Sequence, residues 1–319
     1  MNLSNNNQLI EEILSLKKQR NAVILAHFYQ DEEIQDIADF VGDSLDLSRK
    51  ASSTDADEII FCGVKFMAEV AKILSPQKKV LIPDFKAGCS LEDSCKPKDF
   101  AKFREQNPDA IAITYINCSA EIKALSDIIV TSSNAEKIIS QIPLHKKIIF
   151  APDQHLGRFI IKKTGRDMIL WHGSCIVHEQ FSERELIKLT AKYPNAKTIA
   201  HPECPEDLLK YANHIGSTSS LLNYVKNNQG AEFIVLTEPH IIHQMNKINP
   251  SAKFYDCPFL NSSGCSACNN CPYMQLNDIE KLHEVIKLEN KSRFGGELIL
   301  SETLRLQAEK PLKKMLEMS

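Results

Sequence analysis

The segment 21–30, NAVILAHFYQ, recurs in altered form at 109–118, DAIAITYINC, and at 195–204, NAKTIAHPEC. Each copy is an apolar run followed by polar side chains, which is the pattern of a buried strand that ends in a reactive loop. A second apolar run and a helical pattern follow every copy. This alternation predicts an α/β fold with mostly parallel sheets, built from three similar units. Helical sequence after Asp278 lies outside the repeats and predicts packing helices, with an interruption at Pro311.

A hydroxyl side chain follows each of these strands at a fixed interval of seventeen residues. The pairs are His27 and Ser44, Tyr115 and Ser132, and His201 and Thr218. Each hydroxyl begins a helical pattern, where it suits an ordinary N-cap that contributes about 1 kcal/mol. A helix N-terminus also favours a phosphate or carboxylate, so the repeated spacing indicates an anion-binding position. Ser133 is an alternative to Ser132, because only the spacing fixes the register.

Every unit also carries cysteine after its second strand and helix. Cys89 and Cys175 follow in the first two units, whereas the third offers the loop 265–272, CSACNNCP. One cysteine per unit is the pattern of a ligand set that meets on a pseudo-threefold axis. An iron–sulfur cluster held by three thiolates leaves one iron free to bind a substrate oxygen as a Lewis acid.

The CSACNNCP loop is open to two other interpretations. Its cysteines would suit a zinc site, with Cys257 as the fourth ligand. Two of its thiols would also suit a redox-active CxxC pair, which can coexist with a cluster bound through the last cysteine. The loop thiols are Cys265, Cys268 and Cys271. The other cysteines are interpreted as unliganded buried residues: Cys62, Cys95, Cys118 and Cys204.

Composition argues against several classes of function. The 319 residues carry a formal net charge of -3, with no basic stripe for nucleic acid. No apolar run is long enough to cross a bilayer, and the N-terminal sequence does not resemble a secretion signal. Ten cysteines without an export signal indicate a reducing compartment. We therefore expect a cytoplasmic protein that acts on small molecules.

Seven motifs lie along the chain in a fixed order: AHFYQDEEIQDIADFVGDSLDLS at 26–48, TYINCSAEIKALSD at 114–127, VTSSNA at 130–135, WHGSCIVHEQF at 171–181, AHPECP at 200–205, GSTS at 216–219 and CPYM at 271–274. Together they resemble the quinolinate synthase family, the iron–sulfur enzymes of NAD biosynthesis. The agreement of many separated motifs in one order argues against a chance match.

The resemblance implies three similar αβα domains around a pseudo-threefold axis with a central cavity, which we place at 1–105, 106–190 and 191–319. It implies one [4Fe-4S] cluster in that cavity, held by one cysteine per domain: Cys89, Cys175 and Cys271. It also implies the reaction, in which iminoaspartate and dihydroxyacetone phosphate condense to quinolinate with loss of phosphate and water. A transient contact with the enzyme that makes iminoaspartate is left open.

The substrate-binding positions that the resemblance implies include all six residues of the repeated pairs. They are His27, Ser44, Tyr115, Asn117, Ser132, His201, Glu203 and Thr218. His178 either joins them or only orients the loop of Cys175. For the chemistry we predict Glu203 as general base and Tyr29 as proton shuttle, with His201 as a further candidate. No role is assigned to His155, His172, His240 and His243.

Two other functions compete with this prediction. Another [4Fe-4S] dehydratase would use the open iron on a hydroxy acid, and an iron–sulfur sensor would need little polar chemistry beyond its cysteines. Histidine, tyrosine and hydroxyl groups stand at matched points of three units. This arrangement favours an enzyme over a sensor.

Overall fold

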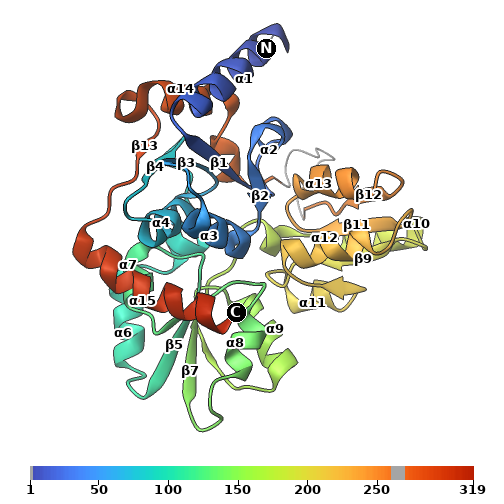
Figure 1. Ribbon diagram of the computed structural model, residues 1–319. Coiled ribbons are helices and arrows are strands. Elements are labelled where there is room, and N and C mark those ends of the chain that lie inside the picture. Colours follow the sequence, from blue (N-terminus) through green and yellow to red (C-terminus); the bar gives the residue numbers. More distant parts are fainter. Residues whose placement is uncertain (1–2, 260–269) are drawn as a thin grey trace.

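Three largely parallel sheets dominate the computed structural model, which describes residues 3–259 and 270–319 (Figure 1). Four consecutive strands form the parallel part of each sheet, and their spatial order is the same in all three: second, first, third and fourth along the chain. The first sheet contains β1 (Ala22–His27), β2 (Phe40–Gly42), β3 (Glu58–Cys62) and β4 (Lys79–Ile82); the second, β5 (Ala110–Tyr115), β6 (Ile128–Val130), β7 (Lys147–Ala151) and β8 (Ile169–Leu170); the third, β9 (Lys197–Ala200), β10 (His214–Ile215), β11 (Glu232–Leu236) and β12 (Lys253–Asp256). This threefold topology confirms the predicted α/β class.

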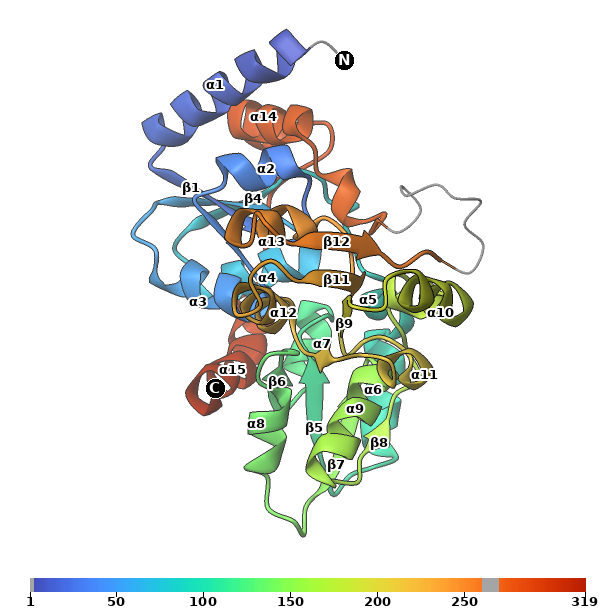
Figure 2. The same ribbon diagram turned by 90° about the vertical axis from the view of Figure 1, so that its right-hand side faces the viewer.

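A helix lies in every connection between the parallel strands of one sheet, as a crossover between parallel strands requires (Figure 2). These helices are α2 (Glu32–Ile37), α3 (Ser44–Ser53) and α4 (Lys65–Leu74) in the first unit; α7 (Ala120–Ala124), α8 (Ala135–Ser140) and α9 (Gln154–Thr164) in the second; α11 (Glu206–Leu209), α12 (Thr218–Lys226) and α13 (Ile241–Ile248) in the third. The remaining helices are α1 (Leu3–Gln19), α5 (Ser90–Ser94), α6 (Pro97–Glu105), α10 (Glu183–Lys192), α14 (Ile279–Leu288) and α15 (Glu302–Met318).

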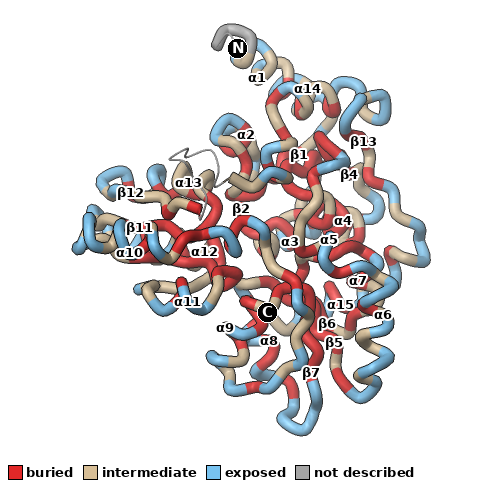
Figure 3. Tube along the Cα trace, turned by 180° about the vertical axis from the view of Figure 1, so that it is seen from behind, coloured by how far each residue is buried: buried red, intermediate tan, exposed pale blue. Residues whose placement is uncertain are grey.

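The strands form where the sequence is continuously apolar. In β1 every residue after Ala22 is buried, and in β9 every residue after Lys197 is buried. Strands covered on both faces by helices favour such runs over an alternating pattern. Figure 3 shows much of the length of these strands as buried.

The C-terminal elements return to the first and second units. Leu282 of α14 shares a core with Ile13 of α1, and β13 (Gly296–Glu297) pairs antiparallel with β4. Helix α15 packs against α7 and β6 and buries Leu312. It also continues through Pro311, so the predicted interruption is wrong. Burial of this helix face compensates for the missing backbone hydrogen bond.

Helix α10 precedes the third sheet in sequence and packs into the core of that sheet. Leu186 of α10 lies in one apolar cluster with Leu208 and Ile234. The domain limits at residues 105 and 190 remain predictions. Among the described residues, no helix combines the length and apolar character that a membrane span requires.

Candidate functional site

One cavity is lined by residues from all three units. It lies at the carboxyl ends of the first strands, the edge where parallel α/β sheets bind ligands. All thirteen residues that sequence reasoning proposed line this cavity: His27, Tyr29, Ser44, Cys89, Tyr115, Asn117, Ser132, Cys175, His178, His201, Glu203, Thr218 and Cys271. The structure therefore brings the predicted site together, while the role of each residue remains a prediction.

The three cysteines reach the cavity from different segments. Cys89 directly precedes α5, Cys175 lies in the loop after β8, and Cys271 precedes a short 3₁₀ helix (Met274–Leu276). Burial raises the pKa of the Cys271 thiol to about 11 and those of Cys89 and Cys175 well above the usual value. The pKa values of Cys89 and Cys175 are raised further by the negative charge of a neighbouring cysteine of the three. Three thiolates in this cavity would therefore need a cation to balance their charge.

The spacing of these thiols bears on the kind of metal. Among the described residues, one set of three donor atoms lies within 4.8 Å of one another, and it comprises Cys175, His178 and Glu203. Three sulfurs on a single zinc ion would lie within about 4 Å of one another, given Zn–S bonds of about 2.3 Å. The cysteine triad is not such a set among the described residues. It suits a cluster in which each thiolate binds a different iron.

His27 is the last residue of β1 and His201 directly follows β9, and the backbone fixes the same tautomer in both. The N–H of Tyr29 donates to Nδ1 of His27 over 3.2 Å, and the N–H of Glu203 donates to Nδ1 of His201 over 3.4 Å. A neutral imidazole whose Nδ1 accepts carries its proton on Nε2. Nε2 of His201 lies 3.3 Å from Oγ of Ser132. Both rings therefore carry an Nε2–H donor.

Both imidazoles are neutral at neutral pH. Burial lowers the pKa of His27 to about 4 and that of His201 to about 3, although nearby carboxylates oppose the shift. Taking a charged imidazole out of water is unfavourable, which is the cause in each case. The site thus has two uncharged donors at matched positions.

The hydroxyls at the helix starts are not the N-caps. Asp43 is the N-cap of α3, and its carboxylate accepts hydrogen bonds from two backbone N–H groups. Ser217 is the N-cap of α12. Ser44 and Thr218 are the first helical residues, so their hydroxyls do not cap the helix and line the cavity instead. The N-cap interpretation is wrong by one residue in these two units and by two in the second, where Asn134 rather than Ser132 is the N-cap position of α8.

Of the two adjacent serines in the second unit, Ser132 lines the cavity. Ser133 donates to Oδ2 of Asp43 over 2.6 Å, which joins the second unit to the first. The interval of seventeen residues therefore selects the serine that faces the cavity.

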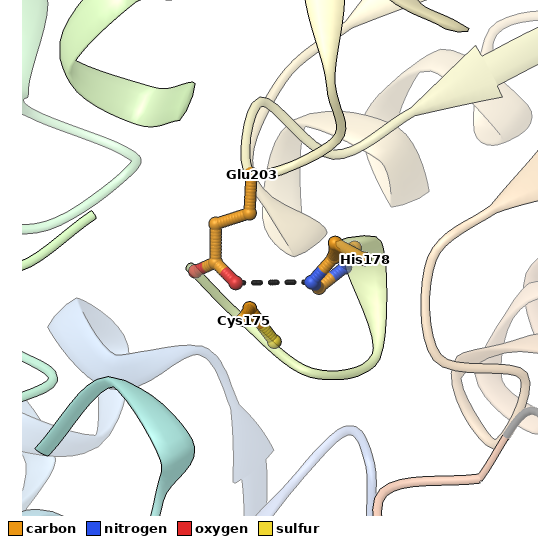
Figure 4. Close-up of side chains that lie close together, drawn as sticks. All are labelled: Cys175, His178 and Glu203. Carbon is orange, nitrogen blue, oxygen red and sulfur yellow. Dashed lines mark ion pairs between the residues drawn. The ribbon is translucent and has the colours of Figure 1, made fainter. Parts of the chain in front are cut away.

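Figure 4 shows the Glu203 carboxylate facing the His178 ring, with Cys175 beside them. The Glu203 carboxylate is buried, and its Oε1 accepts the Tyr115 hydroxyl over 2.6 Å. Oε2 lies 3.0 Å from Nδ1 of His178, an ion-pair contact outside ideal hydrogen-bond alignment (Figure 4). Burial alone would raise the pKa of Glu203, but His201, His178 and the Tyr115 hydroxyl hold it below its usual value. Glu203 is therefore ionised at neutral pH.

The contacts continue from His178 to Tyr29. Nε2 of His178 lies 2.9 Å from Oγ1 of Thr237, which lies 2.6 Å from the Tyr29 hydroxyl. An ionised carboxylate can only accept a hydrogen bond, so Nδ1 of His178 carries a proton, and when the ring is neutral its Nε2 accepts a hydrogen bond from Thr237. The Thr237 oxygen then accepts from Tyr29. Burial raises the pKa of the Tyr29 phenol well above its usual value. The series of hydrogen bonds from Tyr29 to His178 therefore begins at a neutral donor.

Sequence reasoning missed Thr237 and Glu238, which follow β11. Glu238 is fully buried and lines the cavity, and Thr237 is buried beside it. A signal was available, because the carboxyl ends of all parallel strands in a sheet lie at one edge. The polar residues after the third strand of each unit belong to that edge as much as those after the first.

The other cysteine predictions have different outcomes. The four expected to be unliganded are buried and do not line the cavity: Cys62, Cys95, Cys118 and Cys204. Cys265 and Cys268 lie outside the described residues. The zinc and redox interpretations of their loop therefore stay predictions.

The chain was compared with known proteins. A family model described as Quinolinate synthetase A protein matches residues 11–317. A quinolinate synthase of Synechocystis sp. is 58% identical over 98% of this chain and 95% of its own length. That of Ehrlichia chaffeensis is 57% identical over 98% of both chains, and that of Cyanophora paradoxa is 55% identical over 99% of this chain and 94% of its own. The chain belongs to the quinolinate synthase family of enzymes.

Proposed function

We propose that this enzyme condenses iminoaspartate with dihydroxyacetone phosphate to give quinolinate, phosphate and water. The observation that carries the proposal is that every residue singled out for this chemistry lines one cavity. We also propose that the units at 1–105, 106–190 and 191–319 are related by a pseudo-threefold axis through that cavity. A transient contact with the enzyme that makes iminoaspartate belongs to the same proposal.

Cys89, Cys175 and Cys271 would hold a [4Fe-4S] cluster. The support for this assignment is their origin in three units and their common place in the lining of the cavity. When bound, such a cluster supplies an open iron position that acts as a Lewis acid toward a substrate oxygen.

The cavity binds anionic substrates mostly through neutral donors. His27 and His201 offer Nε2–H groups, while Ser44, Ser132 and Thr218 offer hydroxyls. Such groups can hold carboxylate and phosphate oxygens without a cluster of lysines. The buried Oδ1 of Asn117 lacks a partner among the described residues, so it would accept a hydrogen bond from a substrate N–H or O–H.

A proton would leave Tyr29 through Thr237 to His178. Glu203 would orient the His178 ring and stabilise the imidazolium that forms, as the carboxylate of a Ser-His-Asp triad does. This arrangement assigns proton acceptance to the His178–Glu203 pair rather than to Glu203 alone. The Tyr29 phenolate would then remove a substrate proton, and the reverse transfer would supply a proton to a leaving hydroxyl.

Thr237→Val keeps the shape of the side chain but removes the hydroxyl between Tyr29 and His178. Because proton transfer by positioned groups contributes about 10²–10⁴-fold, we expect kcat to fall by about 10²-fold. Thr237→Ser retains the hydroxyl and should stay within about fivefold of wild type, since only a methyl group is lost. Steady-state rates of anaerobic, cluster-loaded enzymes measure both. A Thr237→Val enzyme as fast as Thr237→Ser would exclude the relay.

Ser132 and Ser133 form a natural pair for testing substrate binding. Ser132→Ala removes a hydroxyl that faces the cavity, so we expect KM for dihydroxyacetone phosphate to rise by about tenfold, the equivalent of one hydrogen bond to a charged group. Ser133→Ala removes only the contact with Asp43 and should leave KM unchanged, at a cost of about 1 kcal/mol in stability. Equal KM values for the two variants would contradict the assignment.

The reaction itself is tested by supplying both substrates to the anaerobically purified, cluster-loaded protein and measuring quinolinate by chromatography. Quinolinate should accumulate with one phosphate released per product. No quinolinate from a fully loaded protein would overturn the proposed function.

A further inference from the structure

Glu238 is a fully buried carboxylate that the proposed chemistry does not use, and it contacts the backbone of Cys271. Its Oε1 accepts the Cys271 N–H over 3.2 Å. The same oxygen lies 2.8 Å from Nδ1 of His240, and Oε2 accepts the His240 N–H over 2.9 Å. Glu238 therefore joins the segment of the third cysteine to the start of α13.

His240 is held in turn by the first unit. Its Nε2 lies 3.1 Å from Oδ1 of Asp31, which follows Tyr29 and Gln30 in the loop after β1. Burial opposes a charge on the ring, but the Asp31 and Glu238 carboxylates raise the pKa of His240 to about 10. The imidazolium thus lies between two carboxylates from different units.

Two buried amides reinforce this connection. Nε2 of Gln30 donates to the Met274 carbonyl over 3.2 Å, three residues after Cys271. Nε2 of Gln35 donates to the carbonyls of Gln30 and His240 over 2.7 and 3.1 Å. The loop that carries Tyr29 and the segment that carries Cys271 are therefore fixed to each other through side chains of the first and third units.

We propose that Glu238 and His240 are positioning residues that hold Cys271 in place for cluster binding. The inference rests on the proposed role of Cys271 as a cluster ligand. Groups that hydrogen-bond around metal ligands typically change metal affinity by about 10–100-fold when they are removed. Cys89 directly precedes helix α5, whereas Cys271 is followed only by the short 3₁₀ helix Met274–Leu276.

His243 offers a matched control on the same helix. Its side chain is 17% exposed, as is that of His240, and it also pairs with the first unit, with Nε2 2.7 Å from Oδ1 of Asp36. The difference between the two is the contact with Glu238. His240→Gln and His243→Gln should therefore loosen the same interface, but His240→Gln alone should disturb Cys271.

The experiment loads each protein with cluster anaerobically and follows the loss of cluster absorbance after adding an iron chelator. We expect the cluster to leave His240→Gln and Glu238→Ala about tenfold faster than wild type. His243→Gln should match wild type within twofold. Glu238→Gln, which keeps an oxygen acceptor for the Cys271 N–H, should restore most of the retention lost in Glu238→Ala.

Thermal unfolding of the cluster-free proteins separates positioning from a general loss of stability. The two histidine variants should unfold at similar temperatures, since each loses its contacts with carboxylates of the first unit, which are Asp31 for His240 and Asp36 and Glu32 for His243. Equal rates of cluster loss from His240→Gln and His243→Gln would overturn the inference and leave the proposed function standing. A wild-type protein that takes up no cluster would overturn the proposed function itself.

Discussion

Glu203→Gln is expected to lower kcat by about 10³-fold while leaving the cluster content unchanged. The glutamine keeps the size of the side chain but removes the charge that fixes Nδ1 of His178 as a donor. It also weakens the acceptor for the Tyr115 hydroxyl. In a Ser-His-Asp triad, the corresponding change of the carboxylate costs about 10⁴-fold because the imidazole adopts the wrong tautomer. The effect here should be comparable, since the carboxylate stands in the same relation to the ring.

The measurement is the rate of quinolinate formation in a single turnover, with enzyme in excess over substrate. Glu206→Gln is the control, because Glu206 lies three residues away and forms only an exposed ion pair with Lys162. The control should keep the wild-type rate. If Glu203→Gln also stayed within threefold of wild type, the carboxylate would have no part in proton transfer.

Each of Cys89→Ala, Cys175→Ala and Cys271→Ala is expected to lose the cluster and to form no detectable quinolinate. Every one of these thiols lines the cavity and comes from a different unit. Two remaining thiolates would hold an iron–sulfur cluster poorly, because such clusters depend on cysteine thiolates for their attachment. Iron and sulfide analysis after anaerobic reconstitution measures the loss directly.

Cys95→Ala is the matched control for Cys89→Ala. Cys95 lies at the other end of α5, where it is buried, and it does not line the cavity. It should retain full iron and sulfide. A Cys271→Ala protein with a full cluster would instead assign the third ligand to Cys265 or Cys268, which lie outside the described residues.

The strands and the outline of the site could be predicted because both follow from local sequence. Buried parallel strands such as β1 and β5 are continuous apolar runs, and the residues after them must meet at one edge of the sheet. The interval of seventeen residues then placed Ser44, Ser132 and Thr218 in the cavity.

The unpredicted features depend on contacts between distant segments. Thr237 becomes part of the series of hydrogen-bonded side chains only because Tyr29 and His178 approach it from other units. His240 looked like an isolated histidine, since its partner Asp31 is far away in sequence. The return of α15 to the second unit likewise depends on tertiary packing, which also carries that helix through Pro311.

We propose that three cysteines hold a cluster with one iron left open to substrate. The ⁵⁷Fe Mössbauer spectrum of the anaerobic, cluster-loaded protein, recorded with and without quinolinate, detects such an open iron. We predict that about one quarter of the iron signal shifts on addition of quinolinate, because one iron of four lacks a thiolate. A spectrum with all irons unchanged in the presence of saturating quinolinate would contradict the claim.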